Sequence, residues 1–314
     1  MGCPCGGGYG GNSNQRQRAH DAASDGGTIP LSISGSESGT GDDDAGRDFH
    51  EGGVPMRTFW TLFQKELRES WRSFKFLWMP LLFIFLGISD PLMNYYMEDI
   101  LSAVGNLPEG FSITFPEYSA QDILLATTGQ FQSIGLIVLV IIASGMINKE
   151  RQNGTALFIY VRPISFTAMF FSKWAAVNLL GVCSVILGYG ASMYYTAILY
   201  GTVEPLAFIQ MVASYCVWIV FATTIALMLS AMFNTALSMT LSIIVLPVGI
   251  MIQSMIGKFW SISPWKLADY SVALLSQTDH EYYGKTLLLT VVIIFISIAI
   301  GIIFTRKNAS AVKV

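Results

Sequence analysis

Long windows without any ionisable side chain dominate the sequence after residue 75. Five of them contain no Asp, Glu, Lys, Arg or His: Phe76–Ser89, Ile123–Asn148, Trp174–Val203, Pro205–Gly257 and Thr286–Thr305. A helix needs about 20 apolar residues to cross the hydrocarbon core of a bilayer. The pattern therefore predicts membrane-spanning helices.

The lengths of these windows fix the number of spans. The fourth window has 53 residues, enough for two helices, and "FNTA" (Phe233–Ala236) predicts the turn between them. The first window is short, so its helix must continue past Asp90 and Pro91 to about Tyr96. We therefore expect six spans within residues 76–305, which puts both ends of the chain on one side of the membrane.

Composition agrees with this interpretation. Hydrophobic residues make up 53% of the chain and charged residues only 12%, whereas charged side chains are roughly a quarter of a soluble domain. The sequence therefore predicts an all-α membrane protein in a lipid bilayer, and we expect no nucleic-acid partner.

The basic residues predict the orientation, because loops rich in Lys and Arg stay in the cytoplasm. Twelve fall on one side: Arg57, Lys65, Arg68, Arg72, Lys75, Lys149, Arg151, Arg162, Lys173, Arg306, Lys307 and Lys313. The outer loops, 97–122 and 258–285, hold only Lys258, Lys266 and Lys285. Both termini, the loop 149–165 and the tail 306–314 are therefore predicted to be cytoplasmic. The membrane is predicted to be the plasma membrane.

Residues 1–55 differ from the rest. They hold 14 glycines and eight acidic residues against three Arg, and such a segment cannot bury enough apolar surface to offset its chain entropy. We expect a disordered leader, native or appended, with Met56 resembling an original start. Cys3 and Cys5 have no second pair nearby and make a poor metal site.

A helical pattern precedes the first span, in residues 56–75. Phe59, Trp60, Phe63, Leu67, Trp71 and Phe74 recur at helical spacing, and Lys65, Arg68, Glu69 and Arg72 occupy the other side. This pattern is typical of an amphipathic helix in the membrane interface. The alternative is a cytoplasmic extension of the first membrane helix.

The sequence holds few means of driving transport by itself. Ion-coupled transporters place ionisable residues inside the bundle, and only Asp90 comes close to one of the windows. No G-x-x-x-x-G-K-[ST] phosphate loop occurs either. If the chain moves a solute, we expect the energy to come from a separate ATPase subunit.

The loop 149–165 interrupts two charge-free windows. Asn153-Gly154 predicts a turn, Thr155 can cap a short apolar helix, and Pro163 ends it before Ser165 caps the next span. Such a helix would suit a groove on a partner protein. A connector that dips into the membrane is the alternative.

Several segments resemble ABC-2 type permeases. "ERQNGTALFIYVRPIS" (Glu150–Ser165) is similar to the cytoplasmic coupling loop of that family, and "RTFWTLFQKELRES" (residues 57–70) to its N-terminal connecting helix. "SPWKLADY" (Ser263–Tyr270) resembles its re-entrant outer helices, although the aromatic residues there also fit an interfacial belt. The resemblance covers residues 57 to about 305 and implies the ABC-2, type V exporter-like permease fold.

The resemblance also implies partners and roles. The family pairs with a second permease subunit, identical or different, and with nucleotide-binding ATPase subunits that carry ATP and Mg²⁺, so no cofactor is expected in this chain. The residues implied in coupling to the ATPase are Glu150, Arg151, Gly154, Thr155, Leu157, Phe158, Ile159, Tyr160, Pro163 and Ile164.

Uncharged polar and small residues inside the spans suggest further contacts. Gln130, Gln132, Asn178, Thr223, Thr224 and Gln253 either line a pathway or form hydrogen bonds between helices. Gly181, Gly188, Gly190, Ala191 and Ser192 would permit close helix approach. Cys183 and Cys216 fit small packing residues, and the scattered methionines fit packing better than a metal site.

Two functions remain from the sequence. The first is the permease subunit of an ATP-driven exporter, with an amphipathic compound, peptide, drug or lipid-linked molecule as cargo. The second is a membrane immunity or sensor scaffold of the same fold that transports nothing.

Overall fold

The computed structural model describes residues 55–104, 118–152, 165–256, 260–276 and 281–311, and these belong to one compact unit. Within them every regular element is helical. The elements are α1 (Pro55–Arg72), α2 (Lys75–Tyr95), α3 (Met97–Val104), α4 (Ala120–Gln130), η1 (Phe131–Gly135), α5 (Leu136–Gln152), α7 (Phe166–Leu199), α8 (Pro205–Met232), α9 (Thr235–Ile256), η2 (Pro264–Lys266), α10 (Leu267–Ala273), η3 (Leu274–Ser276) and α11 (Tyr283–Ala311). The leader 1–54 lies outside the described residues.

Six helical stretches are long and apolar enough to cross a membrane: Lys75–Tyr95, Ala120–Ile147, Phe166–Leu199, Pro205–Met232, Thr235–Ile256 and Tyr283–Asn308. The prediction of six spans is therefore confirmed. The first helix continues through Asp90 and Pro91 as predicted, and the turn between α8 and α9 falls within Phe233 and Asn234.

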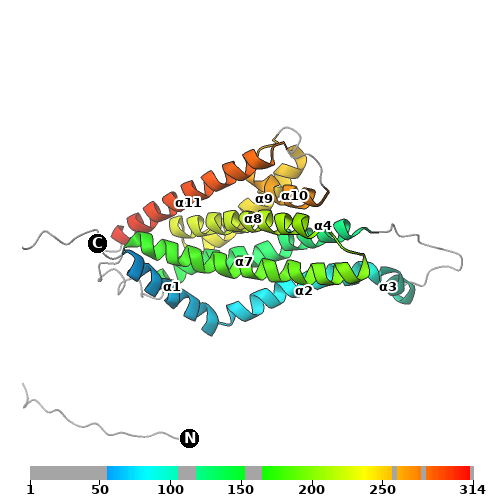
Figure 1. Ribbon diagram of the computed structural model, residues 1–314. Coiled ribbons are helices and arrows are strands. Elements are labelled where there is room, and N and C mark those ends of the chain that lie inside the picture. Colours follow the sequence, from blue (N-terminus) through cyan, green and yellow to red (C-terminus); the bar gives the residue numbers. More distant parts are fainter. Residues whose placement is uncertain (1–54, 105–117, 153–164, 257–259, 277–280, 312–314) are drawn as a thin grey trace, which may run out of the picture. The chain divides into compact units, whose positions relative to one another are not determined.

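Two sets of contacts define the two ends of the bundle. At one end, Asn308 of α11 donates a hydrogen bond to the carbonyl of Ala231 at the end of α8. We call this the α1 end, because α1 lies there together with the C-terminal end of α11 (Figure 1). At the opposite, far end, Tyr200 donates to the carbonyl of Pro91. Both α2 and α7 therefore run from the α1 end to the far end.

An aromatic cluster fills the centre of the bundle. Phe131 packs edge to face on Phe83 of α2 and Tyr189 of α7, with ring centroids 5.0 and 4.8 Å apart, and Tyr215 of α8 packs on Tyr189. All four rings are fully buried. Phe131 opens the single π-helical turn η1 that joins α4 to α5, so the extra residue in that turn lies at the core.

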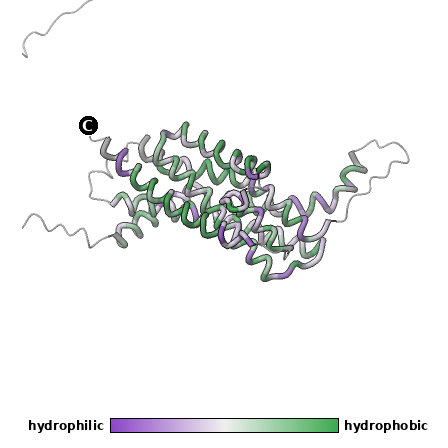
Figure 2. The backbone as a smooth tube through the Cα atoms, turned by 90° about the horizontal axis from the view of Figure 1, so that it is seen from above, coloured by the Kyte–Doolittle hydropathy of each residue, from purple (hydrophilic) through white to green (hydrophobic). Residues whose placement is uncertain are grey.

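The outer helices carry exposed apolar faces, as expected in lipid. Large hydrophobic side chains are exposed on α2 (Leu77, Trp78, Leu81, Phe85), on α9 (Ile244, Val248, Met251, Met255) and on α11 (Leu288, Val292, Phe295, Ile303). Hydrophobic residues run along most of the helices in Figure 2. Apolar surface of this extent is stable only against lipid or another apolar surface.

The small residues of α7 do not behave alike. A Cβ on Gly87 of α2 would overlap the backbone carbonyl of Gly188 on α7, so the two helices touch through their backbones. Gly188 is thus a contact residue, as predicted, and Ser192 bonds to Thr127 of α4. The prediction for Gly190 is wrong, since nothing lies within 4 Å of a Cβ added there.

The described part of the loop 258–285, which the sequence predicts to be an outer loop, also packs on the bundle. Trp265 stacks edge to face on Phe221 of α8, with centroids 5.5 Å apart, and Leu267 and Ala268 of α10 are buried. The hydroxyls of Tyr283 and Ser214 are hydrogen-bonded. Trp265 is therefore a packing residue, so an interfacial belt does not account for the whole aromatic set.

The glycine contact gives a first prediction. In Gly188→Ala, the new Cβ would lie 2.7 Å from a ring carbon of Phe131 and 2.8 Å from the backbone oxygen of Phe83. Overpacking of this kind costs about 1–3 kcal/mol, so thermal unfolding in detergent should occur at a lower temperature. Gly190→Ala, two residues away in open space, is the matched control and should leave the unfolding temperature unchanged or slightly raised. Equal melting of both variants would contradict the α2–α7 contact.

Candidate functional site

The helix α1 has three faces, and each meets a different environment. One face carries Phe59, Glu66 and Ser70 and packs on α7, with Glu66 and Ser70 buried. A second carries Trp60 and Trp71, exposed by 56% and 73%. Such exposed tryptophans suit the membrane interface. The third face is polar.

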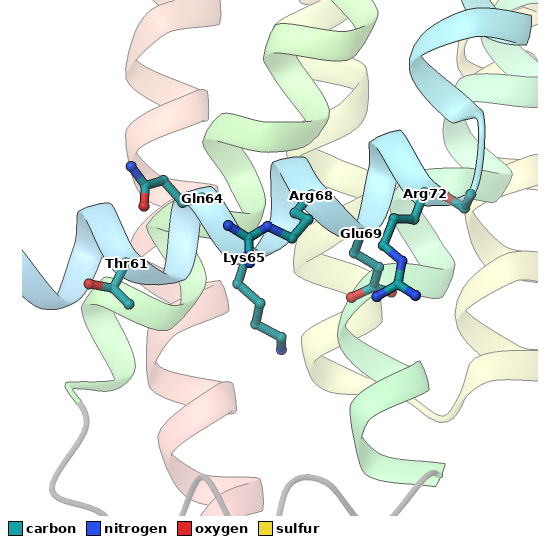
Figure 3. Close-up of a pocket in the computed structure, with 7 residues that line it drawn as sticks. Thr61, Gln64, Lys65, Arg68, Glu69 and Arg72 are labelled. Carbon is teal, nitrogen blue, oxygen red and sulfur yellow. The ribbon is translucent and has the colours of Figure 1, made fainter.

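The polar face of α1 forms a shallow hollow of about 680 Å³. It is lined by Thr61, Gln64, Lys65, Arg68, Glu69, Arg72 and Ser73. Figure 3 shows α1 crossing in front of the upright helices, with these side chains on the side away from the bundle. The predicted polar side of the amphipathic helix is therefore confirmed, and its charge is predominantly positive.

The two helices α1 and α2 are separate. Phe74 has φ 56° and ψ 14°, the left-handed conformation, at the junction between Arg72 and Lys75. A non-glycine residue rarely adopts this conformation, and here it turns the chain from α1 into α2. The alternative interpretation of α1 as a straight extension of the first span is therefore wrong.

A buried ion pair holds α1 on α7. The Lys173 Nζ donates to the Glu66 Oε1 at 2.7 Å, and the two side chains are exposed by only 3% and 5%. Two opposite charges this close and this desolvated depend on each other, because removing either one takes away the nearest counter-charge of a buried group. The pair fixes the position of α1 relative to the first turns of α7.

The sequence did not single out this pair. Lys173 counted only as a basic residue flanking a span, but α7 begins at Phe166, so Lys173 lies inside the helix. The signal for Glu66 was its place on the same helical face as Phe59 and Ser70, since an acid among buried positions indicates a partner.

Most residues implied in coupling lie outside the described residues. Glu150 and Arg151 are in the last turn of α5, and their side chains are not described. Gly154, Thr155, Leu157, Phe158, Ile159, Tyr160, Pro163 and Ile164 all fall in the undescribed segment 153–164. Ser165 occupies the N-cap position of α7, but its side chain makes no capping hydrogen bond, so that part of the prediction is wrong.

The polar residues inside the spans mainly join helices. Thr223 of α8 donates to the Asn178 Oδ1 on α7 at 2.8 Å, and the Trp174 Nε1 donates to the Thr224 Oγ1 at 2.8 Å. Asn178, Thr223 and Thr224 thus lie together between α7 and α8. Hydrogen bonding between helices accounts for them.

The three glutamines lie elsewhere. Gln130 at the end of α4 donates to Asp90 of α2 at 2.7 Å. Gln132 is in η1 and partly buried, and Gln253 on α9 makes a long contact of 3.5 Å to the carbonyl of Trp260. The six candidate pathway residues therefore do not form one lining.

The residues at the α1 end suit the transmission of movement between helices. Among the described residues no three His, Cys, Asp or Glu side chains gather as a metal site would require. What the end offers is a surface helix tied by an ion pair to a membrane helix. A movement of one therefore displaces the other.

The ion pair gives a second prediction. Glu66→Gln removes the carboxylate that lies 2.7 Å from the buried Lys173 Nζ and should lower the free energy of unfolding by about 3–5 kcal/mol, the typical cost of breaking a buried ion pair. The double variant Glu66→Met/Lys173→Met should recover most of this loss, because apolar replacement of both partners is often neutral. Thermal unfolding of the purified variants measures both effects.

Lys65→Met is the matched control. Lys65 is 3.9 Å from the Glu66 carboxylate but 44% exposed, and exposed pairs contribute at most about 1 kcal/mol. If Glu66→Gln and Lys65→Met unfolded at the same temperature, the buried pair would have no structural role.

Comparison with known proteins identifies the family. The family described as ABC-2 family transporter protein matches residues 60–309 of this chain. The chain is also similar to an uncharacterized transmembrane protein, YxlG, of Bacillus subtilis (strain 168), with 31% identity over 180 residues that cover 57% of this chain and 70% of that protein. With its six candidate spans and its match over nearly all described residues, the chain belongs to the ABC-2 family of transporter proteins.

Proposed function

We propose that this chain is the transmembrane permease subunit of an ATP-binding cassette exporter, driven by ATP that a separate subunit hydrolyses. The observation that carries the proposal is the tie between α1 and α7 through Glu66 and Lys173. It lies in the first turns of the helix that directly follows the segment 153–164, where the sequence resembles a coupling loop.

The proposed transmission has three steps. The ATPase subunit, which holds ATP and Mg²⁺, binds the apolar residues Leu157 to Val161. Its movement displaces the end of α5 and the start of α7. Because the buried ion pair joins α7 to α1, the surface helix moves with them, and the spans rearrange together around the cargo.

The α1 end faces the cytoplasm in this proposal. Its support is the division of twelve basic residues against three, since basic loops are retained inside.

The exposed apolar faces of α2, α9 and α11 offer room for a second permease subunit. The cargo is proposed to be amphipathic: a drug-like compound, a peptide or a lipid-linked molecule.

Association with the ATPase tests the function. The purified chain should show no ATPase activity alone and should co-purify with an ATP-binding cassette subunit when the two are expressed together. Phe158→Asp places an unpaired charge against the expected apolar groove, which costs several kcal/mol, so co-purification should be lost while expression and membrane insertion stay normal. Phe158→Leu, which keeps an apolar side chain, is the control and should retain binding.

Three outcomes would contradict this proposal. Hydrolysis of ATP by the isolated chain would remove the need for a partner. Undiminished capture of the ATPase by Phe158→Asp would favour a connector that dips into the membrane. A chain that captures no ATPase at all would fit the immunity or sensor scaffold instead.

The orientation can be tested on described, exposed residues. Thr202 lies at the far end and Asn234 in the turn at the α1 end. In a background without Cys3 and Cys5, Thr202→Cys should react with a membrane-impermeant thiol reagent on intact cells, and Asn234→Cys should react only after the membrane is opened. The reverse labelling pattern would invert the proposed orientation.

A further inference from the structure

The outward face of α1 concentrates positive charge. Lys65, Arg68 and Arg72 line its shallow hollow of about 680 Å³ together with a single acid, Glu69. Among the described residues, neither Arg68 nor Arg72 forms an ion pair with an acidic side chain. The hollow therefore carries a net positive charge, and its two guanidinium groups are available to an anion from outside the chain.

The spacing of these side chains suits a phosphate group. Arg68 and Arg72 are four residues apart and are therefore neighbours on the helix surface, with Lys65 one turn earlier. The fork of an arginine binds the oxygens of a phosphate through two N–H groups at once. Gln64 lines the same hollow, and its side-chain amide adds a further donor.

The position of α1 places this hollow at the edge of the membrane-spanning region. The helix ends at Arg72, and the first candidate span begins at Lys75. Figure 3 shows α1 crossing in front of the upright helices, with the polar side chains directed away from them. A helix that crosses the ends of the spans lies at the level of the lipid headgroups.

Two tryptophans lie beside the basic side chains. At about 3.6 residues per turn, Trp60 and Trp71 share one side of α1, between the buried Glu66 and the outward Arg68. Both tryptophans are exposed, and tryptophan is enriched where headgroups meet acyl chains. The apolar and basic sides of α1 thus adjoin each other, as the acyl chains and the headgroup do in a phospholipid.

We propose that the outward face of α1 is a binding site for an anionic phospholipid. Arg68 and Arg72 hold its phosphate, and Lys65 adds positive charge. Trp60 and Trp71 lie against the acyl chains. A lipid with no positive group in its head is favoured, because three bases against one acid repel a cationic headgroup such as choline.

The exposed tryptophans favour a lipid over an acidic protein surface. A polar partner that covered only the basic side would leave Trp60 and Trp71 in water, and exposed apolar surface of that kind generally has an apolar partner. The site needs only the chain and a lipid, so it does not depend on the proposed transport function. Its lipid lies on the side of α1 away from the ion pair, and both contacts hold the helix in place.

Titration with a labelled lipid tests the site. The full chain in neutral detergent is titrated with phosphatidylglycerol that carries a fluorophore on one acyl chain. Each basic residue near an anionic lipid surface changes affinity roughly fivefold, so Arg68→Gln/Arg72→Gln should raise the dissociation constant at least about tenfold. Labelled phosphatidylcholine should bind the wild-type chain more weakly, and the double variant should change its dissociation constant by no more than about twofold.

Two further variants separate a site from general charge. Arg306→Gln/Lys307→Gln removes the same charge from exposed residues of α11 at the α1 end, and should leave the dissociation constant for phosphatidylglycerol within about twofold. Arg68→Lys/Arg72→Lys keeps both charges but loses the paired N–H donors. It should weaken binding about two- to fivefold.

Four outcomes would overturn the inference. Unchanged affinity for phosphatidylglycerol in Arg68→Gln/Arg72→Gln would remove the site, as would unchanged affinity in Arg68→Gln alone if the double variant did not purify as a single species. Equal weakening by Arg306→Gln/Lys307→Gln would show surface charge only. Displacement of the lipid by millimolar inorganic phosphate would indicate a site for free phosphate.

The fourth outcome concerns a protein partner. Wild-type lipid affinity together with lost ATPase capture in Arg68→Gln/Arg72→Gln would assign this face to the ATPase subunit. Failure of the wild-type chain to capture an ATPase would instead affect the proposed function and leave the lipid-binding results as they are.

Discussion

The contact between the backbones of α2 and α7 is the constraint on which the rest of this structure depends. In lipid, apolar side chains gain little by leaving one apolar environment for another, so helices associate through close packing and hydrogen bonds. Gly87 and Gly188 permit that closeness. Because the two helices run in the same direction, their contact aligns the α1 end, where Lys173 meets Glu66, with the far end, where Tyr200 meets Pro91.

Two acidic side chains are buried among the described residues, Glu66 and Asp90, and their surroundings differ. Glu66 has a lysine 2.7 Å away, which makes it part of the architecture: the pair is strong only while both members stay in place. Asp90 has an amide donor on one oxygen and none on the other. The first arrangement resists change and holds α1 in position.

The spans were predictable because the bilayer imposes a length and excludes charge, and these two rules act on the sequence directly. The start of α7 was also predictable, since Ser165 occupies the N-cap position and the helix begins at Phe166, although the Ser165 side chain makes no capping hydrogen bond. Pairwise contacts were not predictable. Nothing in the composition of α7 distinguishes Gly188 from Gly190, and only the direction in which each Cα faces separates a contact from open space.

The same limit applied to the candidate site. Asn178, Thr223 and Thr224 could be chosen as polar residues in apolar spans, but their partners depend on the rotation of α7 against α8. Glu66 was recognisable only by its helical face, and Lys173 only by its final partner. Helical periodicity can be predicted well from a single sequence, but the rotation of one helix relative to another cannot.

Phe74, in the left-handed conformation between α1 and α2, determines the bend between these two helices. A bulky residue in this conformation stores about 1–3 kcal/mol, which the surrounding contacts must hold. The packing of α1 on α7 and the ion pair between Glu66 and Lys173 hold the chain in this bend. The angle between the surface helix and the first membrane helix is therefore set by contacts with a third helix, α7.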